Sequence, residues 1–237
     1  MKAKRPCQSS KRIIAIDGPA GSGKSTVARE LAKRLGLKYI DTGAMYRALT
    51  LKAMRRDVNL GDEETLCRLF KETTIDLVQE SDTLHTLLDG QDVSKEIRDP
   101  EVTRNTFYAA RSPKVRALMV AAQQKMGERG GVVAEGRDAT TVIFPNATNK
   151  IYLDAHLRVR AHRRRADLAD RPPAPTLEEV EAEMHERDQK DLTRPVGPLR
   201  RVPEALYLDT SGLSIEQVIE HILEFVCGGS RPGAGSP

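Results

Sequence analysis

A glycine-rich segment near the N-terminus has the composition of a phosphate-binding loop. Gly18-Pro19-Ala20-Gly21-Ser22-Gly23-Lys24-Ser25 has the spacing Gly-x-x-x-x-Gly-Lys-Ser. Glycines allow successive backbone N–H groups to turn toward one anion, and a helix that follows adds the positive end of its dipole. In such a loop Lys24 reaches the β- and γ-phosphates of ATP, and the Ser25 hydroxyl holds Mg²⁺. We therefore expect the loop and the adjacent Thr26 to bind ATP; an ordinary glycine turn is the alternative.

Arginine recurs at many separate points beyond this loop. Phosphoryl transfer between two phosphate-bearing substrates requires several negative charges to be neutralised while water is excluded. Arginine suits this chemistry because its planar fork binds phosphate oxygens in pairs and stays charged, and one well-placed arginine contributes about 10³–10⁵ in rate. The spacing i, i+4, i+7 places Arg187, Asp191 and Arg194 on one face of a helix if that helix lasts to residue 194. The other arginines of interest are Arg47, Arg116, Arg137, Arg158, Arg160, Arg163, Arg164 and Arg165.

The arginines of residues 158–165 allow three interpretations: a solvated helix face, an RNA-binding patch, or a lid that closes over the reacting groups. Aromatic residues that could stack on bases do not alternate with these arginines, which argues against RNA. The proline-rich break at residues 171–175 would allow a hinge, and this favours the lid.

Two other classes of phosphate-loop protein find no support. A switch GTPase reads guanine with Asn-Lys-x-Asp, but Asn149-Lys150 is followed by Tyr152 where the aspartate should stand. An ATPase motor usually has a strand that ends in a metal-binding aspartate, whereas the corresponding strand here ends Ala134-Glu135-Gly136. These observations favour a kinase that acts on a small molecule.

Strands and helices alternate around the chemical motifs. Short apolar runs predict buried strands at residues 13–16, 38–41, 132–135, 150–154 and 205–209. Helices are predicted after the glycine-rich loop, ending at Gly36, and after the capping residues Ser112, Thr176 and Ser214. This alternation predicts an α/β fold with a mostly parallel sheet. Residues 73–94 predict a small antiparallel insert, with a turn at Asp89-Gly90.

Composition narrows the setting in which the protein works. No apolar run of the 237 residues approaches the roughly 20 that a membrane-spanning helix needs, and the N-terminus lacks the apolar stretch of a secretory signal. Three scattered cysteines, Cys7, Cys67 and Cys227, fit neither a disulfide framework nor a zinc site. We expect a reducing cytoplasm. Residues 1–12 hold five basic residues and no acid, whereas the whole chain has a net charge of +4, so residues 13–237 have a net charge of −1. The body of the protein is therefore not expected to bind polyanions in general.

Together the motifs resemble the bacterial-type cytidylate kinases, a branch of the nucleoside monophosphate kinases. The resemblance covers roughly residues 13–226 and rests on seven segments in order: Ile16–Pro19, Asp41-Thr42-Gly43-Ala44-Met45-Tyr46-Arg47, Gly90–Ser94 with Ile97-Arg98, Pro113–Arg116, Glu135–Asp138, Arg160–Arg164 and Arg187–Asp191.

The resemblance implies a three-layer P-loop kinase with a five-stranded parallel sheet, a small antiparallel-sheet insert that binds the monophosphate, and an arginine-rich lid. The core would comprise residues 13–40, 132–156 and 204–226, the insert about 42–130, and the lid about 157–195. A basic flexible arm (1–12) and a flexible tail (227–237) would flank this domain. Deleting the arm should leave turnover intact.

The family implies transfer of the ATP γ-phosphoryl group to CMP or dCMP, with Mg²⁺. The sequence shows no obvious dimer seam, so we expect a monomer, and we expect that it needs neither nucleic acid nor a membrane. By matching position, Arg47 and Arg137 would bind the acceptor phosphate. Thr42, Arg116 and Asp138 would read the cytosine edge, with Tyr46 packed nearby. The ribose would contact Asp191. The remaining implied site residues are Arg187 near the sugar–phosphate, Arg194 near the base or phosphate, and Arg163 and Arg164 over the transferring group; the catalytic set is Lys24, Arg137, Arg163, Arg164 and Arg187.

Two positions depart from the family pattern. Phe107 stands where a serine near the base is usual, and Thr140 replaces a usual glycine after Gly136-Arg137-Asp138. A β-branched residue disfavours positive φ, so we expect the loop at Thr140 to differ. The alternatives kept open are a kinase for another small acceptor, such as UMP or shikimate, and an ATP-binding RNA-associated protein.

Overall fold

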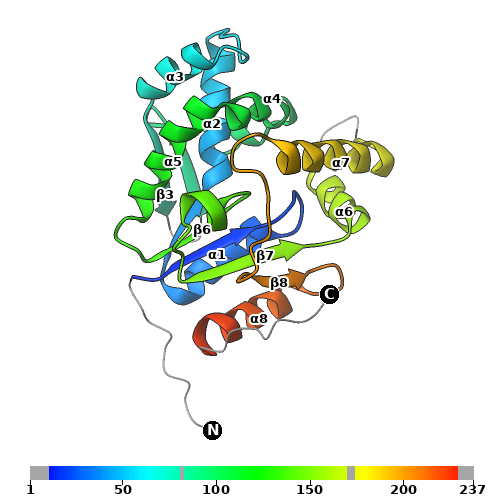
Figure 1. Ribbon diagram of the computed structural model, residues 1–237. Helices are drawn as coiled ribbons and strands as arrows, with labels where there is room; N and C mark the ends of the chain where they lie inside the picture. Colours follow the sequence, from blue (N-terminus) through cyan, green and yellow to red (C-terminus); the bar gives the residue numbers. More distant parts are fainter. Residues whose placement is uncertain (1–10, 81–82, 170–173, 229–237) are drawn as a thin grey trace.

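Five parallel strands form the centre of the protein, as the alternation of apolar runs predicts (Figure 1). The computed structural model describes residues 11–80, 83–169 and 174–228. The strand order is β2-β6-β1-β7-β8. Their bounds are β1 Ile13–Asp17, β2 Lys38–Asp41, β6 Val132–Gly136, β7 Asn149–Asp154 and β8 Leu206–Asp209.

The pairing of these strands brings distant motifs to one edge of the sheet. Asp17 at the end of β1 lies in register with Gly136 of β6, and Asp41 at the end of β2 lies in register with Glu135. The segments that leave β1, β2 and β6 therefore emerge side by side at the carboxyl ends of the strands. The chain crosses from one side of β1 to the other between β6 and β7. Open α/β sheets bind their ligands at such a point.

Helices cover both faces of the sheet. One face packs on α1 (Lys24–Leu35) and α8 (Ile215–Gly228), whose apolar side chains include Val27, Leu31, Ile219 and Ile222. The other face packs on α5 (Pro113–Gly127) and on a π-helical turn, η2 (Ala139–Ile143). The result is the three-layer arrangement expected from the sequence.

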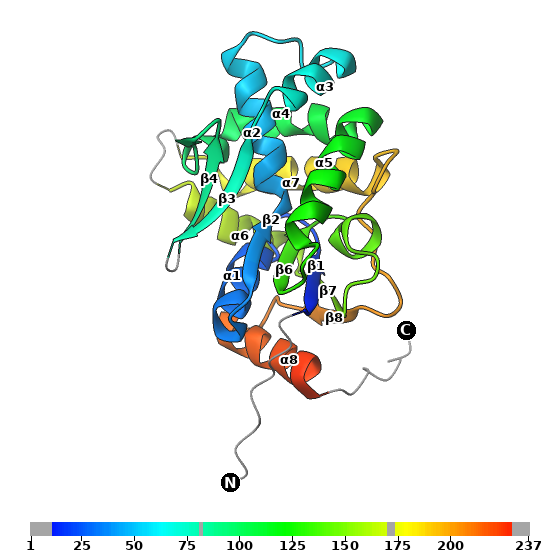
Figure 2. The ribbon, with the colours of Figure 1, turned by 90° about the vertical axis from the view of Figure 1, so that its left-hand side faces the viewer.

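The insert after β2 carries helices and a second sheet, which projects from the core (Figure 2). The strands β3, β4 and β5 are antiparallel in that order, and Asp89 and Gly90 form the turn between β4 and β5 with φ of 50° and 84°. This confirms the predicted antiparallel insert. Its other elements are α2 Thr42–Arg55, α3 Glu63–Lys71, η1 Glu96–Arg98 and α4 Pro100–Arg111, and its strands are β3 Ile75–Glu80, β4 Thr83–Leu88 and β5 Gln91–Asp92.

Two helices, α6 (Leu157–Asp167) and α7 (Leu177–Thr193), form the segment predicted as a lid. Thr176 and Glu179 make the predicted capping box at the start of α7: Glu179 N donates to Thr176 Oγ1 and Thr176 N donates to Glu179 Oε2. Apolar side chains of both helices share one cluster with Ala20 of the glycine-rich loop. The two helices therefore pack directly on that loop.

In the sequence, Gly130-Gly131 marks the expected end of the helix that follows Ser112. Ser112 caps it as predicted, but it ends at Gly127, and Gly130 and Gly131 lie beyond it with φ of 69° each. The helix α3 was not predicted.

The predicted arm and tail fall largely outside the described residues. Arg12, at the end of the arm, donates to Val226 O of α8 at 2.8 Å.

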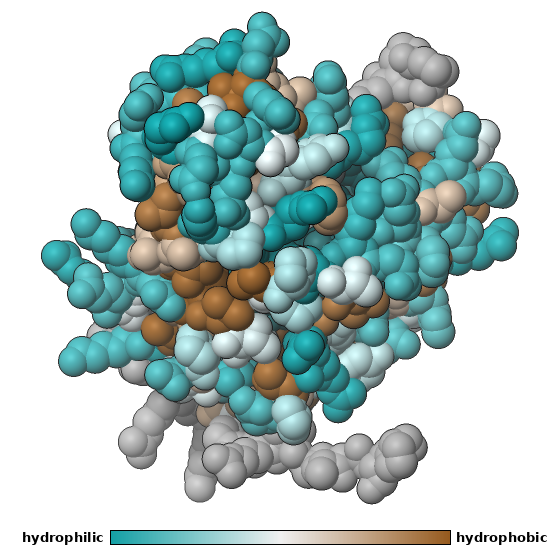
Figure 3. All heavy atoms as spheres, turned by 45° about the horizontal axis from the view of Figure 1, so that its top comes forward, coloured by the Kyte–Doolittle hydropathy of each residue, from teal (hydrophilic) through white to brown (hydrophobic). Residues whose placement is uncertain are grey.

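Within the described ranges no helix is both long enough and apolar enough to span a membrane. The face that contains the insert is mainly hydrophilic, with a localised hydrophobic patch (Figure 3).

Candidate active site

The glycine-rich loop passes from β1 to α1, the position that the motif requires. Gly18 has a φ of 150°, and a Cβ on it would lie 1.9 Å from Leu153 O, so no other residue fits there. Gly23 precedes α1, and no side chain caps the first turn of this helix. The N–H groups at its start are therefore available to an anion.

Lys24 lies over the loop and is buried. Its Nζ donates to Pro19 O at 2.5 Å and to Ser22 Oγ at 3.3 Å. Burial, with repulsion from Arg137, lowers the pKa of the Lys24 ammonium to about 7. A phosphate placed in the loop would relieve both effects, because it supplies negative charge beside the ammonium.

The hydroxyl of Ser25 faces a carboxylate. Ser25 Oγ donates to Glu135 Oε1 at 2.6 Å, and Tyr39 OH lies 3.2 Å from the same oxygen. Two hard oxygen ligands side by side fit Mg²⁺, which binds few protein groups and keeps substrate phosphates and waters as its other ligands. No group of three or more His, Cys, Asp or Glu side chains that could hold a metal ion is found in the described part of the chain.

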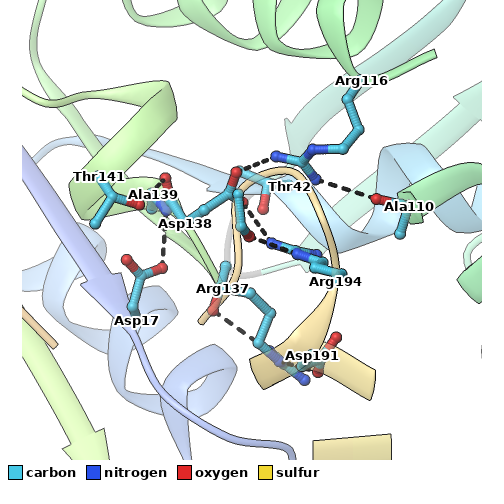
Figure 4. Close-up of polar contacts among 12 residues, drawn as sticks. Asp17, Thr42, Ala110, Arg116, Arg137, Asp138, Ala139, Thr141, Asp191 and Arg194 are labelled. Carbon is cyan, nitrogen blue, oxygen red and sulfur yellow. Dashed lines mark hydrogen bonds and ion pairs between the residues drawn. The ribbon is translucent and has the colours of Figure 1, made fainter. Parts of the chain in front are cut away.

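Asp17 has a different task from Glu135. Its carboxylate accepts hydrogen bonds from Ala139 N, from Thr140 N and from Thr140 Oγ1, at 2.8, 2.8 and 2.6 Å. Burial raises the pKa of Asp17 to about 6. The residue therefore ties the end of β1 to η2, next to the segment that carries Arg137 and Asp138 (Figure 4). Thr140 does not have a positive φ, and its hydroxyl donates to Asp17.

The first turn of α2 holds one wall of the site. Asp41 caps the helix by accepting from Ala44 N at 2.8 Å, and its second oxygen pairs with Arg47 at 2.9 Å. Thr42 Oγ1 donates to Glu135 O at 2.8 Å, which joins α2 to β6. The hydroxyl of Tyr46 is buried and has no hydrogen-bond partner among the described residues.

Arg137 and Arg187 lie at the centre of a cationic cluster. Arg137 Nε donates to Asp191 Oδ2 at 2.8 Å. Arg187 is half-buried, and loss of solvent around it, with the nearby charges of Arg137, Arg47 and Arg164, lowers the pKa of its guanidinium to about 10. Several like charges held together in this way form a binding place for an anion.

Asp138 lies between two buried arginines. Arg116 Nη2 bonds to Asp138 Oδ2, and Arg194 Nη2 lies 3.2 Å from Asp138 Oδ1 (Figure 4). Arg116 is 1% exposed and Asp138 is 3% exposed. A buried charge trio of this kind is costly unless its geometry is well matched, and it offers fixed donors and acceptors to a ligand.

One cavity of about 900 Å³ joins the loop to these arginines. Most of the predicted site residues line it: Ala20, Gly21, Ser22, Gly23, Lys24, Ser25, Thr26, Thr42, Tyr46, Arg47, Arg137, Asp138, Arg163, Arg164, Arg187, Asp191 and Arg194. Three predicted residues lie outside its lining. Gly18 packs against Leu153, and Pro19 O accepts from Lys24 Nζ. Arg116 bonds to Asp138, which does line the cavity.

The two lid arginines are placed differently. Arg163 Nη1 and Nη2 donate to Thr210 Oγ1 at 3.0 Å and to Thr210 O at 2.7 Å. Arg164 lines the cavity and is one of the charges felt by Arg187. In this arrangement Arg163 holds α6 to the end of β8, and Arg164 is the arginine that faces the cationic cluster.

Several residues that the sequence did not assign to the site also line the cavity. They are Arg98 of η1, which belongs to a segment shared with the family but was given no role, and three residues of α4, Thr103, Thr106 and Ala110. The α4 residues have the spacing i, i+3, i+7, so a helical projection would have found their common face. Phe107 is outside the lining and contacts cations, with Arg111 and Lys190 each 5.3 Å from its ring centre. No sequence signal marks Leu213 and Ile215, which line the cavity beyond β8.

Comparison with known proteins agrees with this geometry. The family model for cytidylate kinase matches residues 14–227. A cytidylate kinase of Pelotomaculum thermopropionicum is 47% identical over 219 residues, which are 92% of this chain and 97% of the relative. A cytidylate kinase of a Geobacillus species is 46% identical over 213 residues, 90% of this chain and 95% of the relative. One of Bacillus cereus is 45% identical over 219 residues, 92% of this chain and 97% of the relative.

The loop, the strand order and the insert fit a phosphate-loop kinase, and the match to both the family model and these relatives extends over nearly the whole chain. The chain belongs to the cytidylate kinase family.

Proposed function

We propose that this protein transfers the γ-phosphoryl group of ATP to CMP or dCMP, giving CDP or dCDP. The observation that carries the proposal is the half-buried cluster of Arg187, Arg137, Arg47 and Arg164, which opens into the same cavity as the glycine-rich loop. These arginines and Lys24 line the same cavity, an arrangement that suits the meeting of two phosphate chains. The membership of the cytidylate kinase family supports the choice of acceptor.

The loop would hold the donor. Its N–H groups and the start of α1 would bind the β-phosphate, and Lys24 would reach the β- and γ-phosphates. Ser25 would hold Mg²⁺ with Glu135 beside it, and the ion would supply positive charge that neutralises the charge developing on the phosphate oxygens.

The cationic cluster would hold the acceptor phosphate in line with the donor. Arg47 and Arg137 each form an ion pair with a carboxylate, which fixes their orientation. Arg187 has like-charged neighbours, so binding of an anion beside it is favourable. A phosphate oxygen of the acceptor attacks the γ-phosphorus directly, and the bond from that phosphorus to the ADP oxygen breaks. The arginines stabilise the charge on the transferring group, and no side-chain nucleophile takes part.

The trio of Arg116, Asp138 and Arg194 would read the base. Cytosine differs from uracil by an amino donor and an unprotonated ring nitrogen, so an aspartate acceptor and an arginine donor distinguish the two bases. A carboxylate has about four acceptor positions, so Asp138 can accept from the amino group while it keeps both arginines. Arg116 Nε is buried without a partner among the described residues and could donate. A site of this kind can reject a mismatched ligand by about 10⁴–10⁵.

An acceptor panel tests the proposal. ATP with Mg²⁺ is incubated separately with CMP, dCMP, UMP, AMP and shikimate, and the products are identified by chromatography. CMP and dCMP should give their diphosphates with the highest kcat/KM, and Lys24→Met should abolish all products. Equal or better turnover of UMP, AMP or shikimate would overturn the choice of acceptor. All side chains proposed to bind the two nucleotides come from one chain, so we expect a monomer to be active. We also expect the protein to work in a reducing cytoplasm.

A further inference from the structure

One buried guanidinium joins three separate parts of the fold. Arg160 of α6 donates from Nη1 to Ala20 O of the glycine-rich loop at 3.0 Å and from Nε to Ala155 O, just after β7, at 2.8 Å. The same Nη1 lies 2.7 Å from Asp188 Oδ2 of α7. Arg160 is 6% exposed and Asp188 is 8% exposed. The pair is therefore largely out of contact with solvent.

Asp188 lies on α7, the helix that carries residues proposed to bind the acceptor nucleotide. It follows Arg187 directly and precedes Asp191 by three residues, but it is turned toward α6 and is not part of the cavity lining. Its second oxygen, Oδ1, is buried and has no hydrogen-bond partner within the described residues. Since a helix is rigid over this distance, the bond from Asp188 to Arg160 also fixes where Arg187 and Asp191 stand.

Close packing supports the same connection. A Cβ on Gly21 would lie 2.8 Å from Met184 Cε and 3.1 Å from Arg160 Cβ, so the loop touches both α6 and α7 with no space between them. Ala20 shares a cluster of buried apolar residues with Met184 and Val180 of α7. The loop therefore packs against α6 and α7 together, and the Arg160–Asp188 pair links these two helices to each other.

We infer that Arg160 and Asp188 are positioning residues that set the distance between the donor loop and the acceptor-binding face of α7. The inference rests on the proposed function. It adds two residues that touch neither nucleotide and that act through Ala20 and Arg187. A buried ion pair adds little to stability when compared with apolar residues, whereas a displacement of about 1 Å at a reacting centre can slow a reaction by about 10².

Single-turnover phosphoryl transfer in Asp188→Asn tests this inference. Quench-flow mixing at saturating ATP and CMP gives two separate quantities: the rate constant of transfer, and the amplitude, which counts correctly folded active sites. We expect the rate constant to fall by about 10². The KM of each substrate should stay within about threefold, a difference below 1 kcal/mol. A merely structural role would lower the amplitude and leave the rate constant of the remaining sites unchanged.

Two further variants complete the design. Arg160→Lys keeps the charge but loses the planar fork that serves Ala20 O and Ala155 O together, so its rate constant should also fall. Arg158→Met, which changes an exposed arginine of α6 outside the cavity lining, is the matched control and should transfer at the native rate.

The outcomes separate this inference from the function on which it rests. Native protein that forms no CDP would refute the proposed function, and the inference with it. Native transfer to CMP together with a native rate constant in both Asp188→Asn and Arg160→Lys would refute the inference alone.

Discussion

Binding of a non-hydrolysable ATP analogue should draw a proton from solution onto Lys24. Burial, with repulsion from Arg137 and Arg187, lowers the pKa of this ammonium to about 7 in the nucleotide-free protein. Phosphate oxygens beside it oppose both effects and should restore the pKa toward its ordinary value of 10.5.

The size of the proton uptake follows from these two pKa values. At pH 8 a base with a pKa of about 7 is protonated in about 9% of molecules, so full recovery takes up about 0.9 proton per nucleotide. At pH 6 the base is already about 90% protonated, and the uptake falls to about 0.1 proton. The unfolded chain binds more protons than the folded one between pH 7 and 10.5. The contribution of Lys24 to stability therefore rises with pH across this window.

Isothermal titration calorimetry measures this uptake directly. The analogue is titrated at pH 8 in buffers of different ionisation enthalpy, without acceptor, and the slope of the observed enthalpy gives the number of protons. Asp17, with a pKa raised to about 6, is present in both native protein and Lys24→Met, so the difference between the two isolates Lys24. A slope near zero for the native protein, or an equal slope for Lys24→Met, would refute the reasoning.

Three further comparisons follow from the site. Thr140→Val should lower the free energy of unfolding in urea by about 1.5–3 kcal/mol, because the hydroxyl bonds to a buried carboxylate, while Thr140→Ser should not; equal stability of the two variants would count against that bond. Phe107→Ser should change the ratio of kcat/KM for CMP to that for UMP by less than about fivefold, since the ring lies outside the cavity lining and an exposed cation–π contact is worth about 0.5–1 kcal/mol; a larger change would place Phe107 at the base. Arg164→Met should slow single-turnover transfer by about 10³ or more, and Arg163→Met should slow it less because its fork is bound to Thr210; the reverse order would contradict the assignment of the two lid arginines.

Local signals predicted most of the elements that position the site. Ser112, Thr176 and Ser214 start helices as expected because each hydroxyl accepts from a backbone N–H in the first turn, a contact that needs no distant residue. The strands were equally clear, since a buried parallel strand must be apolar along its whole length. The glycine-rich loop was predictable because its strand and helix are adjacent in the sequence.

Features that depend on distant residues were missed or only partly understood. The short helix α3 lies in a segment with many charges, and its burial of Leu66 and Leu69 against the insert was not anticipated. The π-helical turn η2 forms where Asp17, more than 120 positions earlier, accepts from Ala139 and Thr140. A sequence shows neither of these partnerships.

The roles of individual arginines show the same limit. The sequence treated these arginines as one group, but in the structure their contacts differ. Arg163 donates to Thr210, and Arg160 contacts Ala20 and Asp188. Arg187 lies near other arginines, whose charges lower its pKa. Only the packing of the helices decides which of them face the cavity, because Arg160 and Arg163 lie one turn apart on α6 while Arg187 lies on α7. The individual functional assignments remain predictions that the variants above can test.

A single cavity should bring two nucleotides together phosphate to phosphate. Adenosine and cytidine joined through five phosphates would occupy both positions at once. We predict that this compound competes with ATP and with CMP, and binds at least about 10²-fold more tightly than either, as expected for a ligand that spans both sites. Competition with ATP alone, at an affinity no better than that of ATP, would contradict the account.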